Sequence, residues 1–365
     1  MSLTLGTAQS ERGKITYGEY PLVRHPIGGA DALPVIIAQG QGDGPVFWVT
    51  AGIHGIEHAG LQVIHRLITP ELLADLRGTL VAIPGLNPAG LRTLQRRAYY
   101  HDGDPNRLFP DGRTPFTDPD KAPPSALEQA YGQLFEEIKQ SASYFFDLHC
   151  ISIGSLSFAF RDRLLYRKGD EAARQRAEAT SAKMEAMAHA YGHTLIADFA
   201  VSKYIDEKLH RATTASIAML AGIPALTAEI SSSYTPARAT VNASLAGLRN
   251  ILRWAGMLPG DPEPITGVKV VDPGYPTRRR SVARVTTACI VHHLAEPGDL
   301  VKVGDPLVEM RDAWGRVLGI LYSEYDGFVI SCPPGILYYP GEASVLLAIR
   351  DDEPLVGPYP DTFFD

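Results

Sequence analysis

Two histidines and a glutamate stand directly after hydrophobic stretches that are typical of buried strands. His54 and Glu57 follow VFWV through a glycine-containing turn, and His149 lies at the end of the run YFFDLHC. The carboxyl ends of strands are where α/β folds assemble their sites. Imidazole nitrogen and carboxylate oxygen both bind zinc, and a catalytic zinc site takes three protein ligands and keeps one position open. The spacing therefore predicts a hydrolase with one Zn²⁺ per chain.

Glu229 ends a third apolar segment, PALTAEI, and is the candidate general base. Zinc lowers the pKa of water toward neutrality. Amide hydrolysis also needs a base that takes a proton from water and passes it to the leaving nitrogen, and a carboxylate buried beside a metal ion is suited to that task. The alternative interpretation of Glu229 is a glutamate that caps a neighbouring helix.

A long polar segment, residues 92–115, is dense in Arg, Asp, Asn and Pro. Irregular segments of this length are uncommon in compact domains unless they serve a site. Arg97 or Arg107 is expected to hold a substrate carboxylate or the developing oxyanion, because guanidinium matches a planar carboxylate through paired hydrogen bonds. Asn106 adds a neutral donor, and Asp104 is expected to orient a ligand histidine or an arginine. The alternative is a solvated charged loop.

Strand and helix patterns alternate over the first two thirds of the chain. Extended segments within 12–40 are expected to edge the main sheet as antiparallel strands, and TLVAI continues the core strands. Helices are predicted near 125–140, 169–191, 211–221 and 236–257. The first of these opens with a Ser-x-x-Glu capping box, Ser125 and Glu128. The predicted fold class is α/β, a mixed and mostly parallel sheet flanked by helices.

Composition changes at a Pro/Gly-rich stretch near 259–275, which predicts two domains. Residues 1–262 would form the catalytic α/β domain, and 268–350 a C-terminal all-β domain of sandwich or barrel type, followed by an acidic, Pro-rich tail. The run EPGDLVKVGDPLVEM resembles the turns of lipoyl or biotinyl carrier domains. The stretch EMRDAWG lacks the modifiable lysine of such carriers. This domain is therefore expected to shape the mouth of the active site.

Charge and cysteine content exclude several classes of protein. The 365-residue chain has a formal charge of -7 and 21% charged residues, which argues against a nucleic-acid partner. Cys150, Cys289 and Cys332 are scattered, which favours a reducing compartment over a disulfide framework. Cys150 is expected to be a buried apolar side chain that points away from His149. No secretory signal or membrane span is predicted, so a cytoplasmic location without membrane contact is expected.

Together these motifs resemble the succinylglutamate desuccinylase/aspartoacylase family of the zinc carboxypeptidase-like clan. The resemblance rests on GIHGIE, NPAG, Arg97, DGDPNRLFP, DLHC and TAEI, and it covers almost the whole chain. It implies that His54, Glu57 and His149 bind zinc, that Glu229 is the general base and acid, and that Arg97 polarises the scissile carbonyl. It also implies that Asn106 and Arg107 bind a carboxylate of the substrate. Members of this clan are often oligomers, so the resemblance also implies a possible homo-oligomer.

The resemblance implies deacylation of an N-acyl amino acid or a related small amide. This chain has Asp-Pro-Asn-Arg where the family usually has Asp-Leu-Asn-Arg, and SSSY follows Glu229. These departures leave the acyl specificity open. A second-domain tyrosine near the site is also implied, and Tyr338 or Tyr339 is the candidate. The alternatives are a metallocarboxypeptidase that acts on small or modified peptides and a non-catalytic small-molecule binder.

Overall fold

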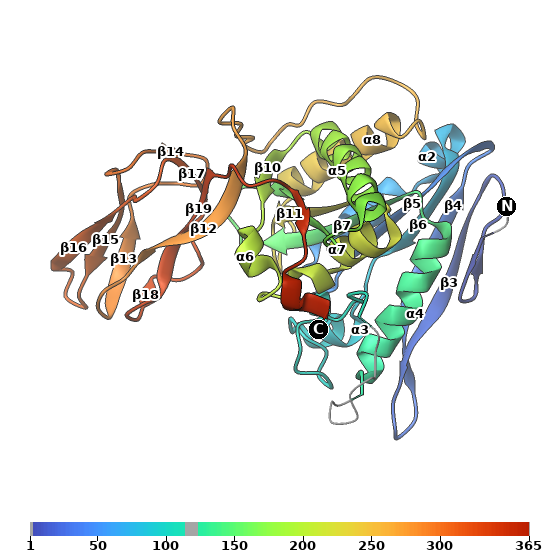
Figure 1. The fold of residues 1–365 in the computed structure, drawn as a ribbon, viewed down its shortest axis with the longest axis horizontal. Coiled ribbons are helices and arrows are strands. Elements are labelled where there is room, and N and C mark those ends of the chain that lie inside the picture. The colour runs from blue at the N-terminus through green and yellow to red at the C-terminus, as the bar shows by residue number, and fades with distance from the viewer. Residues whose placement is uncertain (1–2, 114–122, 365) are drawn as a thin grey trace.

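A single 12-stranded sheet runs through most of the molecule (Figure 1). This computed structural model describes residues 3–113 and 123–364. The last two positions of the predicted 92–115 segment, 114 and 115, lie outside the described residues. The strand order is β14-β17-β19-β12-β10-β8-β11-β7-β5-β6-β4-β3. A four-stranded sheet of order β16-β15-β13-β18 packs in the C-terminal region.

Among the described residues up to 231, the first five strands precede any helix, and the later strands are interspersed with helices, as the sequence predicts. The strands are β1 (Thr4–Leu5), β2 (Ala8–Gln9), β3 (Lys14–Arg24), β4 (Ala30–Gln39), β5 (Gly42–Ala51), β6 (Arg77–Ile83), β7 (Tyr144–Ile151), β8 (Phe158–Arg161), β9 (Leu164–Tyr166), β10 (Thr194–Ala197) and β11 (Ala225–Ser231). The helices are α1 (Ala59–Leu67), α2 (Pro70–Asp75), α3 (Pro88–Thr93), α4 (Ala126–Ser141), α5 (Glu171–Tyr191), α6 (Val201–Tyr204), α7 (Thr213–Ser216) and α8 (Arg238–Trp254). Three short helical turns of other types, at Pro105–Arg107, Leu209–Arg211 and Ile217–Ala221, complete this part.

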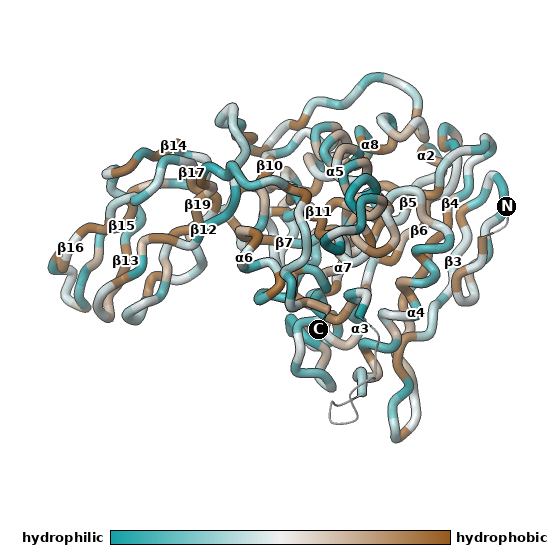
Figure 2. Tube along the Cα trace, viewed as in Figure 1, coloured by the Kyte–Doolittle hydropathy of each residue, from teal (hydrophilic) through white to brown (hydrophobic). Residues whose placement is uncertain are grey.

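The central strands form a mixed sheet with helices on both faces, which confirms the predicted fold class. β5 pairs in parallel with β6 and β7, and β7 pairs in parallel with β11. Along β5, Phe47 packs with residues of α1, α5 and α8, whereas Trp48 packs with residues of α4 on the other face. Successive side chains of a strand point to opposite faces, so one hydrophobic run fills both layers. Hydrophobic residues recur along these strands and within the helices that cover them (Figure 2).

The C-terminal region is all β, as predicted, apart from one short turn of helix at Asp361–Phe364. Its strands are β12 (Thr277–Arg284), β13 (Cys289–His293), β14 (Leu300–Val301), β15 (Pro306–Arg311), β16 (Val317–Tyr322), β17 (Gly327–Ser331), β18 (Leu337–Tyr338), β19 (Ala343–Arg350) and β20 (Val356–Pro358). β12 lies beside β10, so the main sheet continues into this region. The end of the chain turns back, and β20 pairs with β9 of the α/β part.

Local signals for the helices are largely confirmed. Ser125 caps α4, and its capping box with Glu128 is complete because each side chain bonds to the backbone of the other residue. The edge position of β3 and β4 is also confirmed. The predicted helix near 211–221 is irregular, since a short α-helix passes into a π-helix that ends at Gly222. Among the described residues, no helix is long and apolar enough to cross a membrane.

Candidate metal centre and active site

His54, Glu57 and His149 converge in the interior of the α/β part. His54 and Glu57 lie in the turn between β5 and α1, and His149 lies near the end of β7, which pairs with β5. One ligand atom from each residue can be chosen so that all three lie within 4.8 Å of one another. All three residues are buried. Within the described ranges this is the one group of three such side chains with metal-ligand spacing.

Each histidine directs one ring nitrogen at Glu57 and the other at a second carboxylate. Nδ1 of His54 is 2.7 Å from Oε1 of Glu57, and Nδ1 of His149 is 3.0 Å from its Oε2. Nε2 of His54 is 3.0 Å from Asp104, and Nε2 of His149 is 3.1 Å from Asp147. Carboxylates that accept a bond from the outer nitrogen of a histidine orient ligand histidines in metal sites. The orienting contact expected for Asp104 is thus present.

The donor set fits a divalent zinc ion. Burial raises the pKa of Glu57, but the facing His54 and His149 outweigh burial and hold this pKa well below its usual range. Burial lowers the pKa of His149, while the Asp147 and Glu57 charges outweigh burial and raise it. A cation held by His54, Glu57 and His149 would replace the protons on the histidine nitrogens that bind it, as metals do on binding. Two nitrogens and a carboxylate match a catalytic zinc site with three protein ligands.

Cys150 takes no part in this cluster through its side chain. Its thiol is buried in the hydrophobic cluster that contains Phe146 and Leu148, as expected from the alternation of side chains along β7. Burial, together with the nearby Glu57 charge, raises the pKa of the thiol. The backbone N–H of Cys150 donates to Oε2 of Glu57 at 3.1 Å. The residue therefore fixes the carboxylate through its main chain.

Glu229 lies beside His149 in the sheet. β11 and β7 are parallel, and their register pairs Glu229 with His149. Both residues line a small pocket, ≈ 90 Å³ in volume, that also includes His54. Burial, with the Glu57 charge acting in the same direction, raises the pKa of Glu229 to about 7. A carboxyl group with such a pKa accepts and returns a proton near neutral pH.

The structure brings Arg96, and not Arg97, into this pocket. The guanidinium of Arg96 donates to Asp104 through Nη2 at 2.8 Å, and its Nη1 lies 3.6 Å from Glu57. Arg97 is exposed and lies outside the pocket lining. The two neighbours cannot be told apart in the sequence, because an irregular segment has no periodicity that assigns its side chains to a face.

Asn106 and Arg107 both line the pocket, at the short helical turn Pro105–Arg107. The Asn106 carboxamide lies 3.4 Å from Nε2 of His149, and its oxygen accepts from the backbone and hydroxyl of Thr213. Arg107 donates to the carbonyl oxygens of Asn106 and Glu207. These bonds hold both side chains in place from two different segments of the chain.

The remaining pocket walls include residues that sequence reasoning missed. Asp162 and Asp198 each follow a short strand directly, a signal of the same kind that identified His149. Arg279 belongs to the basic triplet 278–280 and reaches the pocket from β12 of the C-terminal region. Neither predicted tyrosine lines it: Tyr338 is buried in the core of the C-terminal region, and Tyr339 is exposed. The tyrosine in the pocket is Tyr204.

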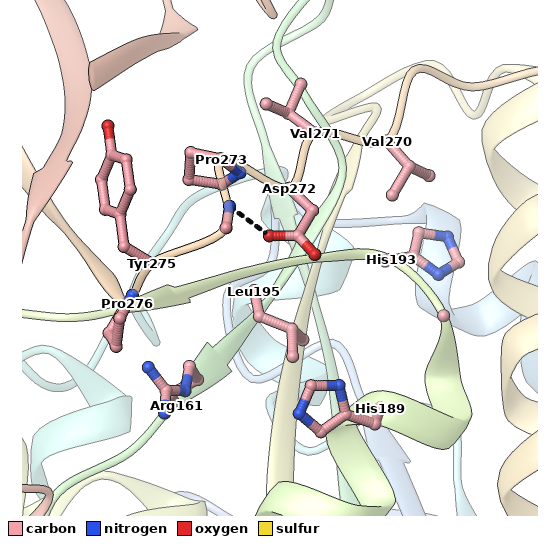
Figure 3. Close-up of a pocket in the computed structure, with 12 residues that line it drawn as sticks. Arg161, His189, His193, Leu195, Val270, Val271, Asp272, Pro273, Tyr275 and Pro276 are labelled. Carbon is pink, nitrogen blue, oxygen red and sulfur yellow. Dashed lines mark hydrogen bonds between the residues drawn. The ribbon is translucent and has the colours of Figure 1, made fainter. Parts of the chain in front are cut away.

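A larger cavity of ≈ 470 Å³ lies elsewhere, beside the segment that joins the two parts of the chain (Figure 3). His189, His193, Arg161 and Asp272 are among its lining residues. The carboxylate of Asp272 accepts a bond from the backbone of Gly274. The cavity shares no lining residue with the pocket at the His54, Glu57 and His149 cluster. The candidate active site is therefore the smaller pocket, which His54 and His149 line.

Residues 43–255, more than half of the chain, match the family model of the succinylglutamate desuccinylase/aspartoacylase catalytic domain. The chain belongs to this family. One relative of known activity, the N-alpha-acetyl-L-2,4-diaminobutyric acid deacetylase of Halomonas elongata, is 29% identical over 82 residues. That match spans 22% of this chain and 24% of the relative.

Solved structures share the succinylglutamate desuccinylase/aspartoacylase fold over nearly the full length. A family protein from Rhodobacter sphaeroides has a TM-score of 0.67 at 20% identity, covering 93% of this chain and 96% of that one. The product-bound ectoine utilization protein EutE of Ruegeria pomeroyi has a TM-score of 0.68 at 19% identity, covering 92% and 95%. Both likenesses extend through the C-terminal β region, so the two-part architecture is that of the family.

Proposed function

We propose that this chain is a zinc-dependent deacylase that hydrolyses the amide bond of an N-acyl amino acid or a related small amide. The convergence of His54, Glu57 and His149 beside Glu229 in one pocket carries the proposal. Membership in a family of deacylases supports the reaction class, and the Halomonas relative is named for the removal of an acetyl group from an amino acid. We propose 1–262 as the catalytic unit and 268–350 as the second domain.

His54, Glu57 and His149 would hold one zinc ion, which would polarise the amide carbonyl and activate water. Glu229 takes the proton from the attacking water and returns it to the leaving nitrogen. Asn106 and Arg107 bind a substrate carboxylate. We assign the stabilisation of the carbonyl oxygen to Arg96 in place of the expected Arg97, because of these two neighbours Arg96 alone lines the pocket. Phe160 and Leu209 contribute apolar side chains to the pocket lining.

Metal content and substrate range test the proposal. The purified chain should contain about one zinc per molecule, and a chelator should abolish hydrolysis of N-acetyl amino acids until zinc is restored. Dipeptides with free C-termini should be poor substrates, because the pocket is small. Faster cleavage of such dipeptides would favour a carboxypeptidase, and a folded, zinc-loaded chain that hydrolyses neither class would favour a binding protein.

Replacement of the proposed base gives the sharpest single prediction. Glu229→Gln keeps the size of the side chain but cannot accept a proton from water. We expect kcat to fall by about 10²–10⁴-fold, the range for a general base, while zinc content stays that of the unaltered chain. The exposed Glu136→Gln on α4 is the matched control and should change neither quantity. An undiminished rate for Glu229→Gln would remove this residue from its role.

A further inference from the structure

Two aspartates and an arginine stand side by side on three neighbouring strands. Asp162 and Asp198 directly follow β8 and β10, and Arg279 lies near the start of β12. β8 and β10 are parallel, and Arg161 pairs with Ala197 at the last register position before Asp162 and Asp198. Ala197 also pairs with Arg278 of β12, which places Arg279 next along that strand. Partner residues on adjacent strands point to the same face of a sheet. All three side chains consequently line the pocket that contains Glu229.

The charges of this group do not balance. Asp198 forms an ion pair with Arg279. In the described part of the chain, Asp162 has no ion pair, and it accepts one hydrogen bond, from the Thr214 hydroxyl at 3.2 Å. Arg107 is bonded instead to backbone carbonyls. A buried carboxylate without a cationic partner is costly in its charged form, and Asp162 is in this position beside the Asp198–Arg279 pair.

The protonation behaviour of Asp162 reflects the same imbalance. Burial, followed by the charge of Asp198, raises the pKa of Asp162 to about 7. His149 and Arg107 oppose that shift without cancelling it. A cation that binds beside this buried carboxyl group would stabilise it, because the cation favours the charged form.

Tyr204 adds an unused polar atom to the same wall. Its hydroxyl is buried, lines the pocket, and has no hydrogen-bond partner among residues 3–113 and 123–364. A buried polar group without a partner costs free energy, and such exceptions often mark a place for a ligand. Asp162, Asp198 and Tyr204 together offer oxygen acceptors, and an ammonium group offers three donors and no acceptor.

We propose that Asp162, Asp198 and Tyr204 form a subsite for a primary ammonium group on the substrate. The preferred substrates are then N-acyl diamino acids, in which the side chain bears the ammonium and the α-nitrogen bears the acyl group. This inference rests on the proposed deacylase function. A pair of aspartates that merely shares a proton to stabilise the fold would give no preference for a cationic substrate.

Three substrates whose side chains place a nitrogen, a methyl carbon or a carboxylate carbon at the δ position test the subsite with the zinc-loaded full chain. They are the Nα-acetyl derivatives of 2,4-diaminobutyrate, norvaline and glutamate, whose side chains end in ammonium, methyl and carboxylate. We expect kcat/KM for the diaminobutyrate derivative to exceed that for norvaline by about 100-fold or more, since a site built for a polar group rejects the analogue that lacks it. The glutamate derivative should be the poorest of the three.

Variants locate the preference in the subsite. Asp162→Asn should lower kcat/KM for the diaminobutyrate derivative by about 100-fold, mainly through KM, and leave the norvaline derivative within about twofold, at unchanged zinc content. Asp261→Asn, an exposed aspartate beyond α8, is the matched control. If Asp162→Asn fails to fold, Tyr204→Phe and the substrate series on the unaltered chain decide the question. Tyr204→Phe should lower the preference for ammonium by about tenfold.

Equal rates for the diaminobutyrate and norvaline derivatives, or a preference for glutamate, would overturn the subsite and leave the deacylase function intact. Hydrolysis of no N-acetyl amino acid by the zinc-loaded chain would overturn the deacylase function, and the subsite with it. A preference for ammonium that survives in both Asp162→Asn and Tyr204→Phe would also contradict the assignment.

Discussion

At the scale of single residues, the cluster of His54, Glu57 and His149 is an arrangement of paired charges. Glu57 faces both histidines, and Asp104 and Asp147 bind their outer nitrogens. Such pairing fixes the ring orientations before any substrate arrives, so that little reorganisation is needed during the reaction. Loss of Asp104 or Asp147 would therefore remove a charge and also release the ring of the histidine that it contacts.

Two adjacent arginines provide a test at this scale. Both are exposed, but Arg96 lines the pocket and contacts Asp104, whereas Arg97 does not line the pocket. Arg96→Ala should lower kcat by about 10²–10³-fold, the loss that follows removal of one donor to a developing oxyanion. Arg97→Ala is the matched control and should stay within about twofold of the unaltered chain. Steady-state kinetics with a zinc assay measure both.

If Arg97→Ala lowered kcat more than Arg96→Ala does, Arg97 would be the residue that stabilises the carbonyl oxygen. A fall in zinc content for Arg96→Ala would show instead that Arg96 supports the metal ligands through Asp104. The zinc assay therefore distinguishes a direct role of Arg96 at the carbonyl oxygen from an indirect role through the metal ligands, which activity measurements alone would not do.

At the scale of elements, the start of β10 carries a buried neutral histidine. His193 stacks on the ring of Tyr191 at 4.1 Å, and its Nδ1 lies 3.1 Å from the Tyr191 carbonyl oxygen. Its Nε2 has no hydrogen-bond partner among the described residues. Burial lowers the pKa of His193 to about 4. The folded chain therefore resists protonation at a position where the unfolded chain accepts it.

Stability should depend on pH through this histidine. The unfolded chain binds the proton near pH 6.5, and the folded chain only near pH 4. The stability that depends on an unprotonated His193 is thus fully present above pH 6.5. It is lost as the pH falls toward 4, and the free energy of unfolding decreases by on the order of 3 kcal/mol in total. Denaturant unfolding at pH 7 and pH 4.5 measures the loss.

His193→Asn retains a donor for the Tyr191 carbonyl and does not titrate in this range, so it should flatten the pH dependence. The exposed His189→Asn, at the edge of the same cavity (Figure 3), is the control and should leave the slope unchanged. A slope that is equally steep in His193→Asn would show that other groups cause it.

At the scale of the whole molecule, a buried ion pair joins the α/β part to the end of the chain. Arg163, between β8 and β9, donates to Asp351 at 2.8 Å, and both side chains are almost fully buried. The same guanidinium donates to the carbonyl oxygens of Phe199 and Pro354. The tail beyond β19 is thereby held against the catalytic part, where β20 pairs with β9.

Breaking this pair should be costly. Arg163→Met leaves the buried Asp351 without its main partner, and we expect a loss of about 3–5 kcal/mol in the free energy of unfolding. Addition of Asp351→Asn should recover part of that loss by removing the buried charge. Lys168→Met is the control, because the Lys168–Asp361 pair also reaches the tail but is exposed, and its loss should cost less than about 1 kcal/mol. Similar losses from both single variants would contradict the structural account.

The sequence by itself determined the fold class and the core of the site. His54, Glu57 and His149 could be found because they lie at or shortly after the ends of hydrophobic strands, and the ends of parallel strands meet at one edge of a sheet. The capping box at Ser125 and the helices near it follow from local hydrogen bonding and periodicity. These signals are contained within a few consecutive residues.

Only the tertiary structure decided which side chains share the pocket. The choice between Arg96 and Arg97, the entry of Arg279 from β12 and the return of the tail onto β9 depend on strand order and on loop paths. Contacts between segments more than 100 positions apart, such as Arg163 with Asp351, have no local pattern. The physical reason is that packing and charge pairing act through space, whereas periodicity and capping act along the chain.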